Sequence, residues 1–144
     1  MSEETEVFLE VIKRYWKTLL KWVLRIHGLP EITVDRLYER LNSSEPPLMI
    51  DIRMPSEYDG TDENSEYGHI PDSLSIPILE LEDKIEELQP YKDKEIVTMC
   101  PGGGMSLAAV EILNDAGFKD VKSLKGGTDL WHKKGYPTTT SSDQ

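Results

Sequence analysis

Residues 96–109 read IVTMCPGGGMSLAA, and this order of apolar run, cysteine, three glycines and second apolar run decides the fold class. The run before Cys100 is typical of a buried parallel strand. Residues 107–116, followed by Gly117, have the composition of a helix. Cys100 is therefore expected at the carboxyl end of a strand, where open parallel sheets bind their ligands. The stretch predicts a strand, a tight glycine loop and a helix built around one thiol.

The alternation of strands and helices continues on both sides of this stretch. Short apolar runs predict three further strands, and helical spacing predicts three further helices, the first with Thr33 as its N-cap. The strands are expected at residues 48–52, 74–76 and 121–124, and the helices at residues 35–41, 79–88 and 128–134. This order favours a three-layer α/β fold, with a central, mainly parallel sheet of about five strands and helices on both faces.

Length, charge and cysteine content limit the class of protein. A chain of 144 residues is long enough for one α/β domain with a core of its own. The formal net charge of −11 argues against a nucleic-acid partner, and a single cysteine excludes an internal disulfide. The acidic start is unlike a secretory signal, and no apolar run reaches the length of a membrane span. These features predict a cytoplasmic protein, with attachment to a membrane surface as an alternative.

Charge divides the chain into a basic helix and an acidic body. Residues 1–30 hold five Lys and Arg against four Glu, whereas the rest holds 11 basic and 23 acidic residues. Apolar residues recur at four- and three-residue spacing through residues 7–27, opposite the basic side chains, as in an amphipathic helix. We expect a helical extension at residues 1–30, a domain at residues 31–137 and a polar, flexible tail at residues 138–144.

The helix at residues 7–27 has three alternative partners. Its broad apolar face, with Phe8, Trp16 and Trp22 opposite basic residues, fits a helix that lies on a membrane surface. The same spacing fits a dimer contact or packing against the domain. The two protein contacts together are favoured, because apolar stripes on helices usually pack against protein.

The glycine loop predicts a reactive thiol. Consecutive glycines let the backbone curl so that its N–H groups point inward as a nest for an anion. The helix that begins near Ser106 directs its positive end to the same point, and both effects favour a thiolate on Cys100. A lone cysteine at a strand end is more often only a small buried side chain. A phosphate loop is the other reading, but the Lys and Ser/Thr that it requires are missing.

Four sequence motifs resemble the rhodanese family, and they follow one another along the chain in the order that the family has. The active-site loop of that family reads C-x-x-G-x-R-[ST], and here Met105 stands where arginine often does. The other three resemble the family patterns I-D-V-R-x-P-x-E-Y, G-H-I-P-G-A-x-x-I-P and G-F-x-x-V…L-x-G-G-x-x-x-W-x-x-x-G-x-P. The stretches are CPGGGMS (100–106), IDIRMPSEY (50–58), GHIPDSLSIP (68–77), and GFKDV (117–121) with LKGGTDLWHKKGYP (124–137). The resemblance covers about residues 31–137 and implies a rhodanese-like fold.

The resemblance implies a sulfurtransferase of the thiosulfate sulfurtransferase type. Cys100 would take a sulfur from thiosulfate or a persulfide donor and keep it as a persulfide. A thiol or cyanide acceptor, or a protein persulfide carrier, would then remove it. This chemistry needs no cofactor and no metal, in agreement with three scattered histidines that lack ligand spacing. The implied donor-binding residues are Pro101, Gly102, Gly103, Gly104, Met105 and Ser106, with Asp51 and Arg53 as supporting residues.

Several features of the sequence bear on this function. The loop carries no basic side chain, which disfavours efficient use of thiosulfate. It is one residue shorter than in rhodanese-fold phosphatases and lacks their arginine, so phosphatase activity is disfavoured. Residues 59–67 are rich in acids and are interpreted as a solvated loop, which would repel dianions if it covers the site. Asp51 and Arg53 also fit a purely structural ion pair.

The alternative function is a non-catalytic rhodanese-like module that serves binding or regulation. Such a module could also act at a membrane.

Overall fold

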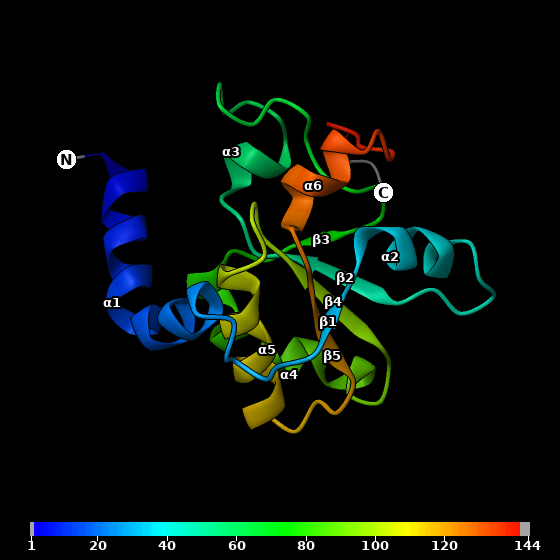
Figure 1. The fold of residues 1–144 in the computed structure, drawn as a ribbon, viewed down its shortest axis with the longest axis horizontal. Helices are drawn as coiled ribbons and strands as arrows, with labels where there is room; N and C mark the ends of the chain where they lie inside the picture. Colours follow the sequence, from blue (N-terminus) through cyan, green and yellow to red (C-terminus); the bar gives the residue numbers. More distant parts are fainter. Residues whose placement is uncertain (1, 142–144) are drawn as a thin grey trace.

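Five short strands form one parallel sheet at the centre of the protein (Figure 1). The computed structural model describes residues 2–141. The strands are β1 (Glu31–Ile32), β2 (Leu48–Asp51), β3 (Leu74–Ser75), β4 (Ile96–Met99) and β5 (Val121–Leu124). Their order is β1-β5-β4-β2-β3, with every neighbouring pair parallel, so β4 is the middle strand. Cys100 follows the carboxyl end of β4, so it lies between the ends of the neighbouring strands β2 and β5.

Helices cover both faces of this sheet. They are α1 (Glu3–Val23), α2 (Val34–Leu41), α3 (Pro55–Tyr58), α4 (Ile85–Leu88), α5 (Met105–Asp115) and α6 (Gly127–Lys133). Side chains alternate across each strand: in β2, Ile50 packs with residues of α5 and α4 and with Val11 of α1. Met49 packs on the opposite face, with residues of α2 and Trp131 of α6. The predicted three-layer α/β fold is therefore confirmed.

Two predicted segments differ in detail from the observed ones. The helix expected at residues 79–88 is a chain of 3₁₀ turns (Ile78–Glu80, Glu82–Lys84 and Gln89–Tyr91) around the short α4. The backbone of Lys84 leaves helical geometry at φ −101° and ψ 0°, and Pro90 has no amide hydrogen to continue a helix. β1 has only two residues and no apolar alternation that could identify it. The predicted N-cap is confirmed, because Thr33 Oγ1 accepts a hydrogen bond from the amide of Arg36 at 3.1 Å.

Helix α1 lies along one side of the molecule and packs against α5 (Figure 1). It begins at Glu3, earlier than residue 7, because Ser2 Oγ caps it by accepting from the amide of Thr5 at 3.1 Å. Val11 is its one buried residue and Tyr15 marks a kink. Thr18 donates a hydrogen bond to a carboxylate oxygen of Glu111 on α5. One face of α1 thus packs against the domain, which was one of the three alternatives.

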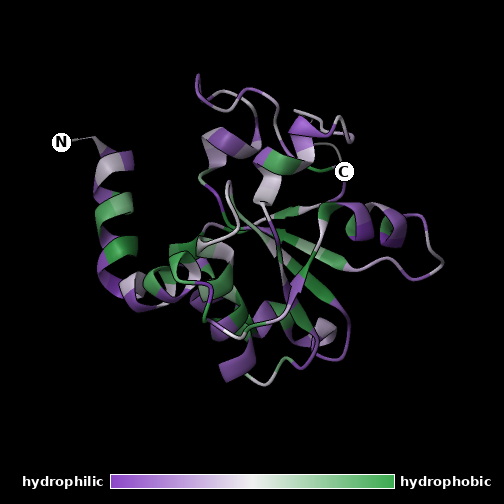
Figure 2. Ribbon diagram, viewed as in Figure 1, coloured by the Kyte–Doolittle hydropathy of each residue, from purple (hydrophilic) through white to green (hydrophobic). Residues whose placement is uncertain are grey.

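A second face of α1 stays exposed although it is apolar. Figure 2 shows hydrophobic residues in α1 at the edge of the molecule as well as in the central strands. The exposed large apolar residues are Phe8, Leu9, Trp16, Leu20 and Val23 in α1, and Leu24 and Ile26 directly after it. Over residues 2–141, no helix has both the length and the apolar character needed to cross a bilayer.

The segment after α6 returns to the domain. Thr139 exchanges two backbone hydrogen bonds with His69, at 2.8 and 2.9 Å. Trp131 Nε1 donates to the carbonyl oxygen of Pro137 at 2.8 Å. Of the predicted polar tail, residues 142–144 lie outside the described residues.

Candidate active site

The thiol of Cys100 is held by the amides of its own loop. Its Sγ accepts hydrogen bonds from the backbone N–H of Gly103 at 3.1 Å and of Ser106 at 3.3 Å. Gly103 adopts φ +96°, a region open to glycine, and this conformation turns its amide toward the sulfur. Ser106 lies in the first turn of α5, so the positive end of that helix also faces Sγ. Two backbone N–H donors and the amino-terminal end of α5 therefore converge on this sulfur.

A buried chain of hydroxyls continues from the thiol. Sγ lies 3.3 Å from Ser106 Oγ, which lies 2.6 Å from Ser123 Oγ, and Ser123 can donate to the carbonyl oxygen of Gly103 at 3.2 Å. Each hydroxyl has a single proton. When Ser123 donates to Gly103, Ser106 donates to Ser123 and offers Sγ a lone pair, which suits a thiol. When Ser106 donates to Sγ instead, Ser123 donates to Ser106, which suits a thiolate. By rotating, the hydroxyls of Ser106 and Ser123 can therefore hydrogen-bond to Cys100 Sγ either as a thiol or as a thiolate.

The start of α6 fixes the other side of the loop. The amide of Thr128 donates to the carbonyl oxygen of Cys100 at 2.9 Å, and the amide of Asp129 donates to that of Pro101 at 3.1 Å. Gly127, at φ +68°, makes this approach possible, since a Cβ there would stand 2.2 Å from the oxygen of Pro101. The carbonyls of Cys100 and Pro101 thus point toward α6.

Helix α1 also contacts the glycine loop, through Trp22. A Cβ added to Gly104 would stand 2.5 Å from Cε3 of Trp22, and one on Gly102 would stand 3.9 Å from its Cη2. Gly104 therefore needs to be glycine because an indole lies directly over it. This contact ties the position of the loop to the position of α1.

Asp51 and Arg53 form a buried ion pair beside the loop. Both side chains are 0% exposed, and Arg53 donates from Nε to Oδ1 at 2.9 Å and from Nη2 to Oδ2 at 2.8 Å. Nη2 also donates to the carbonyl oxygen of Gly68 at 2.7 Å, and Nη1 to Ser65 Oγ at 3.2 Å. The guanidinium therefore holds the segment after β2 against residues 65–68, and its charge is already paired.

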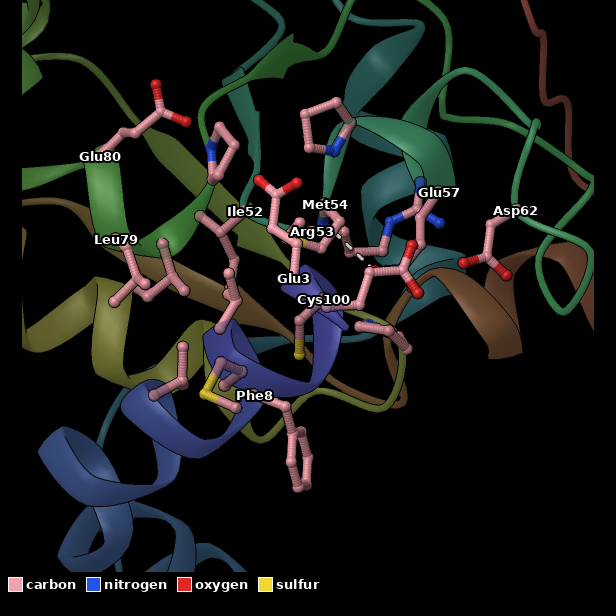
Figure 3. Close-up of a pocket in the computed structure, with 18 residues that line it drawn as sticks. Glu3, Phe8, Ile52, Arg53, Met54, Glu57, Asp62, Leu79, Glu80 and Cys100 are labelled. Atoms are coloured by element: carbon pink, nitrogen blue, oxygen red, sulfur yellow. Dashed lines mark hydrogen bonds between the residues drawn. The ribbon is translucent and has the colours of Figure 1, made fainter. Parts of the chain in front are cut away.

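A cavity of about 490 Å³ opens next to Cys100 (Figure 3). Cys100, Pro101 and Met105 line one side, and Ile52, Arg53 and Met54 come from the segment after β2. Further lining residues come from α1, from α3 and from residues 77–80. Cys100 is only 2% exposed, so a donor has to enter this cavity to reach its sulfur. Asp62 also lines it, which brings one acid of residues 59–67 to the site.

The predicted residues of the cysteine loop make three different kinds of contact in the structure. Pro101 and Met105 line the cavity with Cys100, Gly103 and Ser106 donate amides to its sulfur, and Gly102 and Gly104 lie under Trp22. Burial raises the pKa of the Glu57 carboxyl, which also lines the cavity and accepts from the amide of Met54 at 3.2 Å. No group of three or more His, Cys, Asp or Glu within residues 2–141 is placed to hold a metal ion.

Sequence reasoning missed several residues of this site. Ser123 is a polar side chain at a buried position of β5, and such a residue in an apolar strand is a signal that was available. Thr128 was assigned only to the start of the last helix. The cavity residues of α1 gave no local signal, because their place depends on how α1 packs.

Comparisons with known proteins agree with this geometry. A family model described as "Rhodanese-like domain" matches residues 33–134. The chain is similar to a sulfurtransferase of Allochromatium vinosum, with 33% identity over 107 residues that cover 74% of this chain and 92% of the relative. It is similar to the thiosulfate sulfurtransferase GlpE of Pseudomonas syringae, with 34% identity covering 65% of this chain and 78% of the relative. The crystal structure of a rhodanese-related protein from Thermoplasma volcanium superposes with a TM-score of 0.65 at 31% identity, covering 78% of this chain and 99% of that one.

Proposed function

The chain belongs to the rhodanese-like domain family, and we propose that it is a sulfurtransferase that carries sulfur as a persulfide on Cys100. One observation carries the proposal: Sγ of Cys100 receives two backbone N–H groups and borders a cavity large enough for a small donor. Relatives named as sulfurtransferases support the same reaction class.

The reaction proceeds by covalent catalysis in two steps. In the first, the Cys100 thiolate attacks the outer sulfur of a donor such as thiosulfate or an organic persulfide. A sulfur–sulfur bond to Sγ forms, and the donor's own sulfur–sulfur bond breaks, so that sulfite or a thiolate leaves with the electron pair. In the second step a thiol or cyanide, or a protein persulfide carrier, attacks the outer sulfur and restores the Cys100 thiolate. The loop amides stabilise the negative sulfur in both steps.

Intact-protein mass spectrometry tests this proposal. The native chain is incubated with thiosulfate, with an aryl thiosulfonate or with an organic persulfide, freed of donor, and weighed. We expect a gain of the mass of one sulfur atom, lost again after addition of cyanide. Cys100 is the only cysteine, so the gain has a single possible position among thiols.

The matched control is Cys100→Ser, which keeps the shape of the buried site. It is expected to gain no sulfur from any donor. Absence of the adduct in the native chain with all three donors would contradict the proposal and favour the binding or regulatory module.

We also propose that the exposed face of α1 lies on an anionic membrane surface. Trp16 and Leu20 are 51% and 49% exposed on this face. Five Lys and Arg and no acid occur in residues 12–26, which suits anionic headgroups. The same basic charge on two adjacent copies would repel, so a lipid surface fits this face better than a second copy does.

Liposome co-sedimentation checks the membrane proposal. The native chain is expected to pellet with vesicles that contain phosphatidylserine, and less with phosphatidylcholine alone. The double variant Trp16→Glu with Leu20→Glu should remain in the supernatant, whereas Leu74→Glu, at an exposed apolar position on β3, should pellet like the native chain. A native chain that stays in the supernatant, or a dimer that only the double variant abolishes, would refute it.

A further inference from the structure

The first turns of α1 form one wall of the cavity at Cys100. Val7, Phe8 and Val11 line it from this helix, and Ile52 and Leu79 line it from the domain. The family model matches residues 33–134, so this wall lies before the matched residues.

The wall is fixed to the domain at more than one point. Val11 is 3% exposed and belongs to the same core as Ala108 and Ala109 of α5. Ser56 Oγ of α3 donates to a carboxylate oxygen of Glu4 at 3.3 Å, which links the start of α1 to α3. A donor therefore meets this wall whenever it approaches Cys100.

The lining of the cavity is apolar and acidic. Its five carboxylates come from α1, from the region of α3 and from residue 80 (Figure 3). They are Glu3, Glu4, Glu57, Asp62 and Glu80. Arg53 is the one cationic side chain among the described residues that line the cavity, and Asp51 already neutralises it. A second negative charge on a donor is therefore repelled by the rim without a compensating cation.

We propose that the α1 wall makes the site selective for sulfur donors that carry an apolar group and at most one negative charge, in preference to thiosulfate. This inference rests on the proposed sulfur transfer at Cys100. The donor class comprises organic persulfides and thiosulfonates, whose carbon substituent can lie against Val7, Phe8 and Leu79. The sulfur that reacts can then reach the loop amides without bringing a second charge past the rim.

The transfer from this donor class balances without an added oxidant or reductant. With a thiosulfonate, the Cys100 thiolate bonds to the outer sulfur, and the sulfinate leaves with the electrons of the broken sulfur–sulfur bond. With a protonated organic persulfide, the departing thiolate takes the proton and leaves as a thiol. In each case Cys100 keeps one sulfur atom and one negative charge.

Three donors separate the effect of charge from that of apolar contact. Thiosulfate is a dianion, methanethiosulfonate is a small monoanion, and benzenethiosulfonate is a monoanion with an aryl group. We expect kcat/KM for sulfur transfer to cyanide to rise in this order. Added salt should narrow the gap between thiosulfate and methanethiosulfonate, because the rim is partly solvated and screened.

Paired variants assign the effect to the rim and to α1. Glu3→Gln combined with Glu80→Gln is expected to raise kcat/KM for thiosulfate roughly tenfold relative to methanethiosulfonate. Glu6→Gln combined with Glu86→Gln removes the same charge from exposed positions outside the cavity and should leave this ratio unchanged. Phe8→Ser should reduce the advantage of benzenethiosulfonate over methanethiosulfonate, whereas Leu9→Ser, at the neighbouring exposed position, should preserve it.

The outcomes distinguish the two proposals. If the native chain transfers sulfur from none of the three donors, the proposed function fails. If it transfers sulfur but prefers thiosulfate, or if the rim variant and its control behave alike, the function stands and the selectivity of the wall is refuted.

Discussion

Replacing Arg53 by methionine is expected to lower the free energy of unfolding by about 3–5 kcal/mol. The change removes the partner of the Asp51 carboxylate, which is 0% exposed and would remain buried with its charge uncompensated. It also removes the bonds to Gly68 and Ser65 that hold residues 65–68 against the end of β2. Urea unfolding followed by circular dichroism measures the difference.

An exposed ion pair provides the matched control for this prediction. Arg36 pairs with Glu39 at 3.0 Å, with side chains 61% and 66% exposed. Arg36→Met is expected to change the free energy of unfolding by less than about 1 kcal/mol. The double variant Asp51→Leu with Arg53→Met should recover part of the loss, since no charge is then left buried. If Arg53→Met and Arg36→Met lower the free energy of unfolding equally, burial does not determine how much the Asp51–Arg53 pair contributes to stability.

Replacing Gly127 by alanine is expected to lower the free energy of unfolding by about 3 kcal/mol and to slow persulfide formation at Cys100. The residue has φ +68°, and the new Cβ would stand 2.2 Å from the oxygen of Pro101 and 2.3 Å from that of Cys100. The loop has to move to relieve this overlap, and the amide geometry at Sγ changes with it. Urea unfolding and timed mass spectrometry of the sulfur adduct measure the two effects.

Gly28→Ala separates the overlap from the strain of the backbone angle. Gly28 has a similar φ of +65°, but a Cβ there would meet no atom within 4 Å. Its substitution is expected to cost only about 1 kcal/mol and to leave persulfide formation unchanged. Gly127→Ala and Gly28→Ala could instead lower the free energy of unfolding equally and leave the rate of persulfide formation unchanged. That result would show that close packing between α6 and the loop is not the reason for glycine at position 127.

The sheet and the cysteine loop were predictable because their signals are local. The apolar runs before Cys100 and at residues 48–52 mark buried strands, and the three glycines mark the turn between β4 and α5. β1 was not predictable, since two residues cannot show a period and its pairing with β5 follows from the rest of the fold. The 3₁₀ turns around α4 were missed for a related reason: Leu81 and Leu88 are both buried at helical spacing, although the backbone breaks at Lys84.

The composition of the site was predictable only in part. Cys100 and its loop stand together in the sequence, and Asp51 and Arg53 follow a predicted strand. The wall formed by α1 is different, because Val7 and Phe8 lie more than 90 positions from Cys100 along the chain. The amphipathic pattern of α1 allowed three partners, and only the tertiary structure shows which face packs against α5.

The way α1 joins the domain separates donor choice from sulfur chemistry. Five residues of this helix line the cavity, and only Val11 among them is buried in the core. The other four, Glu3, Glu4, Val7 and Phe8, belong to neither the sheet nor the loop that holds the thiol. Under the proposed selectivity, the entrance is therefore an adjustable part: a library randomised at these four positions would retune which compounds enter, while the same persulfide centre serves every member.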